Sequence, residues 1–210
     1  MANISLKNVM KTYAGGDAAV KDLNLELRDG EFLVLAGPAG SGKSTVVHLI
    51  AGLEEPSAGT LTMDGESLKD VPPRERDVAM VFQNNILYPD MTVYENLEFG
   101  LRMRKISPEI CGERIERTAE ILGLTEILQQ KPGEIGEKQR QMTAVGRAIV
   151  HNPGVLLLDE PFLNLDAELR KKMRIELERL HRELNLTILY ATEDQNEAAA
   201  LGDRVAIMRD

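Results

Sequence analysis

The chain has 210 residues, of which 43% are hydrophobic and 28% are charged, the ordinary balance of a soluble globular protein. Its formal net charge of −9 argues against non-specific nucleic-acid binding as the main role, so no nucleic acid is expected as a partner. No apolar run approaches the ~18 residues of a membrane span, no signal peptide is expected, and the single cysteine, Cys111, fits a reducing cytosol.

The N-terminal part alternates apolar and polar residues, which predicts two strands within residues 1–30, each with one buried face. The side chains expected to share a face are Ile4, Leu6 and Val9 in the first strand, and Leu23, Leu25 and Leu27 in the second. A further strand over 60–65 ends in an Asp-Gly turn, and a short apolar strand is expected at 78–82.

A glycine-rich segment at 37–45 lies between an apolar strand at 32–36 and a helix-compatible run at 44–51. It fits the phosphate-loop pattern G-x-x-x-x-G-K-[ST], whose glycines let the backbone wrap closely around a pyrophosphate. Lys43 would reach the β- and γ-phosphates, and the Ser44 hydroxyl would ligate Mg²⁺. A glycine-rich turn without a ligand is the alternative, and the strand–loop–helix context favours nucleotide binding.

Residues from about 89 to 151 have a helical pattern, with helices expected at 93–101, 108–122, 125–130 and 139–150. This pattern indicates a helical insertion between two strands of a sheet. A longer amphipathic helix is expected at 167–184, packed on the sheet. The three histidines, His48, His151 and His181, do not have metal-ligand spacing, and a packing role is expected for His48.

Two nearly continuous apolar runs, at 155–158 and 187–191, predict strands buried on both faces of a parallel sheet, and 205–208 is expected as one more strand. The first run ends in Asp159 and Glu160, which fits a Walker B element. Asp159 would hold Mg²⁺ through water, and Glu160 would act as general base; a plain capping acid is the alternative. The alternation of strands and helices predicts an α/β fold with an antiparallel part and a helical part.

Further motifs, all in order, resemble those of the ATP-binding-cassette (ABC) ATPases. Lys11-Thr12-Tyr13 resembles their A-loop, Val81-Phe82-Gln83 followed by Tyr88-Pro89 resembles their Q-loop, and Pro161 with Asn164-Leu165-Asp166 resembles their D-loop. Segments 74–77 and 91–96 are similar to those of the maltose and glycerol-phosphate importer ATPases in particular.

The resemblance covers residues 1–210 and implies the P-loop NTPase fold of one nucleotide-binding domain. The core and antiparallel β-subdomain would occupy about 1–86 and 152–210, and the helical subdomain about 87–151. Implied partners are transmembrane permease subunits, docked partly on segment 84–92, and a second nucleotide-binding subunit. Such a chain would be cytoplasmic and peripheral on the inner face of the cell membrane.

The resemblance also implies the cofactors ATP and Mg²⁺ and a role for each matching residue. Tyr13 would stack on the adenine, and Gln83 would touch the Mg²⁺ or the lytic water, although a rim aromatic and a strand-end amide are the plainer alternatives. The residues expected to bind nucleotide are Tyr13, Gly37, Gly40, Ser41, Gly42, Lys43, Ser44, Thr45 and Gln83. Expected metal ligands are Ser44, Gln83 and Asp159, and expected catalytic residues are Lys43, Gln83 and Glu160.

Two motifs depart from the family pattern. Where the signature should be Leu-Ser-Gly-Gly-Gln, residues 135–139 are Ile-Gly-Glu-Lys-Gln, so Gly136 has no hydroxyl for a γ-phosphate and Glu137 places a carboxylate where a partner's triphosphate would dock. A structural interpretation of Glu137 is an acid that satisfies free N–H groups at a helix start, worth ~0.3–1 kcal/mol. Glu193 replaces the switch histidine, and an ionised carboxylate cannot donate a hydrogen bond.

The favoured function is the ATP-binding subunit of an ABC importer, with carbohydrate the expected class of solute. The alternative is a nucleotide-binding module that binds ATP but hydrolyses and dimerises poorly, because losing a positioned proton-handling group costs ~10²–10⁴ in rate. Maltose-type importer ATPases continue into a C-terminal regulatory barrel, whereas this chain ends at Asp210, so sugar-regulatory interactions are expected to be absent.

Overall fold

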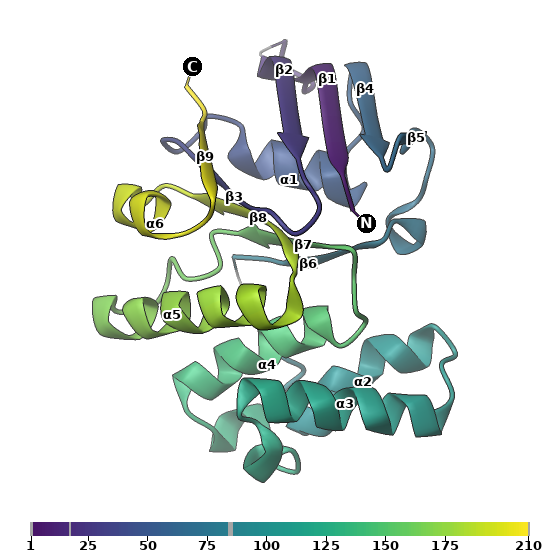
Figure 1. The fold of residues 1–210 in the computed structure, drawn as a ribbon, viewed down its shortest axis with the longest axis vertical. Coiled ribbons are helices and arrows are strands. Elements are labelled where there is room, and N and C mark those ends of the chain that lie inside the picture. Colours follow the sequence, from purple (N-terminus) through teal and green to yellow (C-terminus); the bar gives the residue numbers. More distant parts are fainter. Residues whose placement is uncertain (1, 17, 84–85, 210) are drawn as a thin grey trace. The chain divides into compact units, whose positions relative to one another are not determined.

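The computed structural model describes residues 2–16, 18–83 and 86–209. The chain divides into two compact units (Figure 1). The first unit comprises Met1–Gln83 and Gly154–Asp210, and the second comprises Asn84–Pro153. The first unit contains the strands and the residues expected to bind nucleotide, whereas the second is helical.

An antiparallel sheet forms one layer of the first unit. Among the described residues it has the order β2-β1-β4-β5, with β1 (Ile4–Thr12), β2 (Ala18–Leu27), β4 (Ala58–Met63) and β5 (Glu66–Ser67). Asp64 and Gly65 both have positive φ, 52° and 84°, and join β4 to β5 in the tight turn that an Asp-Gly pair favours. The expected strand with an Asp-Gly turn is therefore confirmed.

Irregular pairing between β1 and β2 explains the uneven apolar spacing of the first strand. The register shifts between Leu6 and Val9, where Asn8 has φ 51°. Its side-chain amide donates a 2.8 Å hydrogen bond to Asp22 Oδ1, and Asp22 also has a positive φ, 46°. Because the bulge reverses the alternation, Val9 is buried like Ile4 and Leu6, as expected.

A parallel sheet forms the second layer of the first unit. Its order among the described residues is β6-β7-β8-β3-β9, and every neighbouring pair is parallel. Its strands are β3 (Phe32–Ala36), β6 (Val78–Val81), β7 (Val155–Asp159), β8 (Thr187–Thr192) and β9 (Arg204–Ile207). Every residue of β3, β7 and β8 is buried. This confirms the prediction, from their continuous apolar runs, of strands buried on both faces of the sheet.

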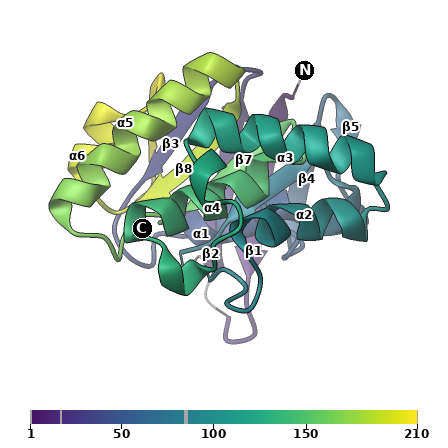
Figure 2. The ribbon, with the colours of Figure 1, turned by 90° about the horizontal axis from the view of Figure 1, so that it is seen from below.

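Helices cover both faces of the parallel sheet. Helix α1 (Lys43–Ala51) lies between the two sheets, and its side chains join one hydrophobic core with residues of both (Figure 1). Helices α5 (Ala167–Leu184) and α6 (Gln195–Ala200) lie on the other face of the parallel sheet (Figures 1 and 2). Helix α5 has the expected bounds and buries Met173, Leu177 and Leu180, whereas α6 was not predicted.

The second unit packs three helices against one another: α2 (Val93–Met103), α3 (Pro108–Leu122) and α4 (Glu137–Ile149). The Thr92 hydroxyl accepts from the N–H of Glu95, whose carboxylate accepts in return from the N–H of Thr92, which fixes the start of α2. The helix expected at 125–130 is wrong: only the single 3₁₀ turn Thr125–Ile127 forms there. The segment is too short to repeat an apolar face.

Two more 3₁₀ turns lie at Pro73–Glu75 and Pro132–Glu134. Within the described parts of the chain, no helix combines the length and the apolar character needed to cross a bilayer. Residues 84 and 85, part of the segment expected to dock permease subunits, lie outside the described residues.

The buried guanidinium of Arg76 ties the end of α1 to the segment before β6. Arg76 is 3% exposed, and its three nitrogens donate to main-chain carbonyls at 2.7–3.1 Å. The accepting carbonyls are those of Leu49, Ile50, Leu68 and Val71. A Cβ at Gly52, which ends α1 with φ 77°, would lie 2.6 Å from Arg76 Nε, so glycine is needed beside the guanidinium.

Arg76→Met should lower the free energy of unfolding of the first unit by about 3 kcal/mol or more, because it leaves several buried carbonyls without a donor. Urea unfolding followed by far-ultraviolet circular dichroism measures the effect. The matched control is Arg74→Met, since that side chain is 84% exposed, and it should change stability by less than about 0.5 kcal/mol. Equal losses in the two variants would contradict this role of Arg76.

His151 follows α4 and packs on α2 within the second unit. A Cβ at Gly100 would lie 2.4 Å from His151 Nε2, so the ring occupies the space that this glycine leaves. Burial, and then the positive charges of Arg104 and Arg114, lower the pKa of His151 to about 4. The imidazole is therefore neutral in the folded unit at neutral and mildly acidic pH.

The second unit should lose stability as the pH falls from about 6.5 to about 4. In this window the unfolded chain binds a proton at His151 that the folded unit excludes, and the slope approaches about 1.4 kcal/mol per pH unit. Amide hydrogen exchange in α2 and α4 measures it. His151→Gln should flatten this dependence, whereas His181→Gln, in the other unit, should not; an unchanged slope in His151→Gln would contradict the assignment.

Candidate functional site

The glycine-rich loop between β3 and α1 has the backbone conformation that its sequence predicts. Gly40 and Gly42 have φ values of 81° and 90°, which side chains disfavour. A Cβ on Gly42 would lie 2.2 Å from the carbonyl oxygen of Ala19, and one on Gly37 would lie 2.6 Å from that of Met208. The loop thus passes close to neighbouring backbone on two sides, and Gly42 directly precedes the first turn of α1.

Lys43, the first residue of α1, directs its ammonium back into this loop. The side chain is 4% exposed, and Nζ donates 2.9 Å hydrogen bonds to the carbonyls of Gly37 and Pro38. Two carboxylates lie slightly farther away, Glu160 Oε1 at 3.8 Å and Glu193 Oε1 at 3.9 Å. The loop therefore holds a buried positive charge against two of its own main-chain carbonyls.

Ser44 and Asp159 meet although 115 residues separate them in the chain. Ser44 Oγ donates a 2.9 Å hydrogen bond to Asp159 Oδ1, and His48 Nε2 lies 3.7 Å from the other carboxylate oxygen. Helix α1 supplies the hydroxyl and the imidazole, and the carboxyl end of β7 supplies the acid. A hydroxyl and a carboxylate are hard oxygen ligands of the kind that Mg²⁺ prefers. His48 thus contacts the site instead of only packing.

Glu160 follows β7 in a left-handed conformation, with φ 47°. Burial raises its pKa to about 7; a hydrogen bond from the Glu193 N–H and the charge of Lys43 oppose the rise, and the charges of Glu193 and Asp159 add to it. Its Oε1 atom is buried and makes no hydrogen bond within the described residues but lies 3.8 Å from the ammonium of Lys43.

Tyr13 and Gln83 come from the ends of β1 and β6. The Tyr13 hydroxyl lies 3.5 Å from Thr45 Oγ1 in α1, which brings the predicted adenine platform to the phosphate loop. The residue is 43% exposed. Gln83 is exposed, and in the described structure it makes no hydrogen bond to Ser44 or Asp159. Its predicted contact with the metal or the lytic water stays a prediction.

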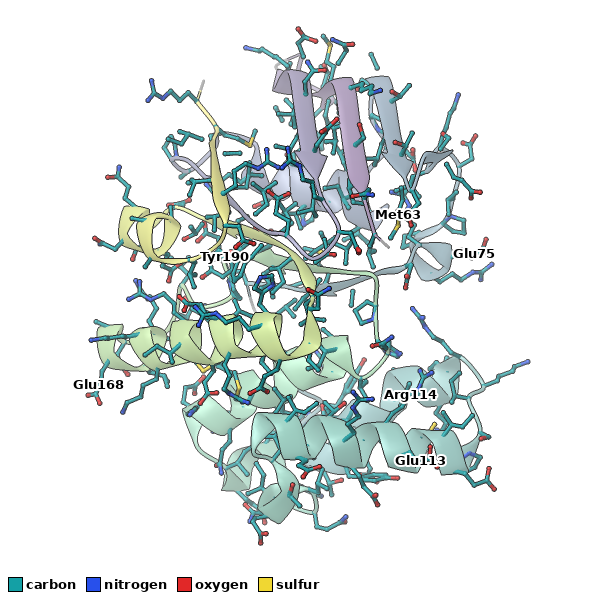
Figure 3. All side chains as sticks on the ribbon, viewed as in Figure 1. Met63, Glu75, Glu113, Arg114, Glu168 and Tyr190 are labelled. Atoms are coloured by element: carbon teal, nitrogen blue, oxygen red, sulfur yellow. The ribbon has the colours of Figure 1, made fainter. Side chains whose placement is uncertain are left out.

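The residues that flank Glu193 in the chain belong to a network of hydrogen bonds and an ion pair that the sequence analysis did not predict. Tyr190 on β8, labelled in Figure 3, and Thr192 both donate 2.7 Å hydrogen bonds to Glu197 Oε2 in α6. Arg170 in α5 pairs with Asp194 at 3.2 Å and donates to the carbonyl of Leu165. A tyrosine within an apolar strand was the available signal, because its buried hydroxyl needs a partner. The network fixes the residues on both sides of Glu193.

The altered signature segment lies at the start of α4 in the second unit. Gln139 Oε1 accepts a 2.9 Å hydrogen bond from the N–H of Gly136. The Glu137 carboxylate accepts from the guanidinium of Arg140 and, at 3.2 Å, from the Gln141 amide. The bond from Arg140 is the largest cause of a lowered Glu137 pKa. The hydrogen bonds to the Glu137 carboxylate therefore come from the side chains of Arg140 and Gln141. The structural interpretation had expected them from free N–H groups at the helix start.

Comparison with known proteins identifies the family. The family model described as ABC transporter matches residues 20–163. An uncharacterized ABC transporter ATP-binding protein, YcjV of Escherichia coli O157:H7, is 52% identical over the whole chain. The trehalose/maltose import ATP-binding protein MalK of Thermococcus litoralis is 49% identical over 99% of the chain. This chain spans 58% and 57% of the lengths of these two relatives.

A solved structure agrees with the sequence comparisons. The dimeric ATP-binding cassette MJ0796, in a post-hydrolysis state bound to ADP and Pi, matches with a TM-score of 0.81 and 31% identity, over 98% of this chain and 94% of the other. The predicted α/β P-loop fold and the resemblance to maltose-type importer ATPases are thus confirmed. With its phosphate loop and the Walker B acid Asp159 meeting at one edge of the parallel sheet, this chain belongs to the ABC transporter family.

Proposed function

We propose that this chain is the nucleotide-binding part of a carbohydrate importer, and that by itself it binds Mg·ATP firmly but hydrolyses it slowly. One observation supports the binding of Mg·ATP. Ser44 of the phosphate loop and Asp159 of β7 are already hydrogen-bonded, beside the Lys43 ammonium, which the loop carbonyls hold. This is the pairing that the binding of a triphosphate and a divalent cation requires.

Mg²⁺ would be held by oxygen atoms of Ser44 and Asp159, with Gln83 as the proposed third ligand. The bound ion would neutralise phosphate charge. Lys43 would orient the β- and γ-phosphates, and the loop N–H groups would bind the same anionic oxygens. Tyr13 would bind the adenine, and the Glu160 carboxylate would accept a proton from the attacking water.

Two features support slow hydrolysis. The carboxylate of Glu193 lies 3.9 Å from Lys43 Nζ, so it adds negative charge near the proposed position of the γ-phosphate, where the family has a donor. Gly136 supplies no hydroxyl, and Glu137 supplies a carboxylate to any surface that would bind a partner's triphosphate. Removing one such donor costs ~10²–10³ in rate. These substitutions also weaken an ATP-bound dimer, since they place anion against anion.

The coupled activity belongs to an assembly. Relatives of the chain include a trehalose/maltose import protein, which supports carbohydrate as the solute class. We propose that permease subunits bind the segment that follows β6, in which Phe82, Ile86 and Tyr88 are exposed, and that a second nucleotide-binding subunit, identical or different, completes the enzyme. Such an assembly would place the chain on the cytoplasmic face of the membrane.

Lys43→Ala should weaken Mg·ATP binding by roughly 10- to 100-fold, because a charge-assisted contact to phosphate contributes about 1.5–3 kcal/mol. Isothermal titration calorimetry measures the dissociation constant. The same titrations with and without Mg²⁺ test Asp159: Asp159→Asn should reduce the increase in ATP affinity that Mg²⁺ produces. The matched control is Lys172→Ala on α5, whose lysine pairs with Glu168 on the surface. Wild-type affinity in Lys43→Ala would refute the nucleotide site.

Restoring the family residues should accelerate hydrolysis. Gly136→Ser, Glu137→Gly and Lys138→Gly combined with Glu193→His should raise turnover at saturating Mg·ATP by about 100-fold or more. Phosphate release measures the rate, and gel filtration with Mg·ATP measures dimer formation. Adding Glu160→Gln to the restored chain should abolish the gain. A starting rate already equal to that of the restored chain would contradict slow hydrolysis.

The two substituted regions can be separated by restoring them one at a time. If Glu193→His alone produces the gain, the defect lies in the chain's own phosphate site. If the signature substitutions are also required, the defect lies in dimer formation, and gel filtration should detect the change. No gain from either set, with turnover remaining at background, would show that these two motifs are not the cause of slow hydrolysis.

A further inference from the structure

Lys11 and Tyr13 form a pair of side chains at the end of β1. The Lys11 ammonium lies 5.1 Å from the centroid of the Tyr13 ring, over one of its faces. At this distance a cation is attracted to the electron-rich face of the ring. One face of the tyrosine is therefore occupied by a side chain of the same strand.

The ammonium of Lys11 is itself held by residues that follow α1. It forms a 2.7 Å ion pair with Glu54 and donates a 2.8 Å hydrogen bond to the carbonyl of Glu55. The Lys11 side chain is only 12% exposed. Since these partners and the ring account for the ammonium, Lys11 is placed to support Tyr13 rather than to act as a phosphate ligand.

Tyr13 is thus held at two points. The ammonium of Lys11 lies over the ring, and the hydroxyl lies 3.5 Å from Thr45 Oγ1 at the start of α1. Even so, 43% of the residue is exposed. An aromatic ring that is held at its face and its hydroxyl, yet exposed elsewhere, is preorganised for stacking, because little side-chain entropy is lost when a ligand binds.

We propose that Lys11 is a positioning residue for recognition of the nucleotide base: with Glu54, it holds the Tyr13 ring so that a purine stacks on the open face. The inference rests on the proposed binding of ATP and assigns a role to a residue outside the phosphate loop. Lys11 acts on the base alone, so it should leave the binding of a bare triphosphate unchanged.

Lys11→Met keeps most of the aliphatic stem and removes the charge. Calorimetry with Mg·ATP should show an affinity about 2- to 5-fold weaker than that of the unsubstituted chain. The same titration with magnesium tripolyphosphate, which has no base, should show no change. Glu54→Gln, which releases the ammonium from its ion pair, should produce a smaller loss for ATP and likewise none for tripolyphosphate. Lys7→Met, an exposed lysine of the same strand, is the matched control.

A double-mutant cycle tests whether Lys11 acts through the ring. In a Tyr13→Ala background, Lys11→Met should have no further effect on ATP affinity, because the side chain that it holds is gone. Equal losses for ATP and tripolyphosphate would instead assign Lys11 to the phosphates and overturn the inference, as would unchanged ATP affinity in Lys11→Met. If the unsubstituted chain binds neither ligand, the proposed nucleotide site fails and this inference fails with it.

Discussion

The buried ammonium of Lys43 is the interaction on which the arrangement of the site depends. A charge that is 4% exposed is tolerated only where partners replace its water, and here two loop carbonyls do so at 2.9 Å. The carboxylates of Glu160 and Glu193 lie within 4 Å of it and follow the carboxyl ends of β7 and β8. The strands β7, β8 and β3 are neighbours in this order and run parallel, so their carboxyl ends lie at the same edge of the sheet. Both acids therefore lie beside the loop that follows β3.

This dependence explains how Glu193 is accommodated without disturbing the fold, and it is the basis of our proposal that Glu193 changes the chemistry of the site. Its neighbours on both sides are fixed, Thr192 through Glu197 and Asp194 through Arg170, so the main chain at position 193 is held whatever side chain it carries. The Glu193 N–H donates to the Glu160 carboxylate in this position. A histidine there could donate toward a γ-phosphate, whereas a carboxylate can only accept a hydrogen bond or attract the cation already in place. The substitution therefore adds one negative charge at a point that the backbone keeps constant.

The sequence predicted most of the fold because its signals were local and strong. The apolar runs of β3, β7 and β8 and the 18-residue amphipathic pattern of α5 each exceed what a loop would show, and the glycine spacing of the phosphate loop reflects backbone angles that the structure contains. The 125–130 helix failed because six residues cannot define an apolar face. The contacts of His48 with Asp159 and of Arg76 with the end of α1 join residues far apart in the chain, and the Glu197 hydrogen bonds depend on how α6 packs beside β8. The periodicity of the sequence reports neither kind of contact.

Both altered motifs carry an acid, and in both cases the chain supplies a nearby cation. Glu137 accepts from Arg140, three residues later on the same helix, and Glu193 lies beside Lys43 within its own unit. Neither acid therefore needs a phosphate or a partner subunit to balance its charge. In an intact cassette the corresponding positions offer donors to a triphosphate and so favour the ATP-bound dimer. Local pairing of this kind stabilises the unliganded chain. The slow hydrolysis and weak dimer formation that we propose follow from it, because ATP and a second subunit would have to compete with contacts that already exist.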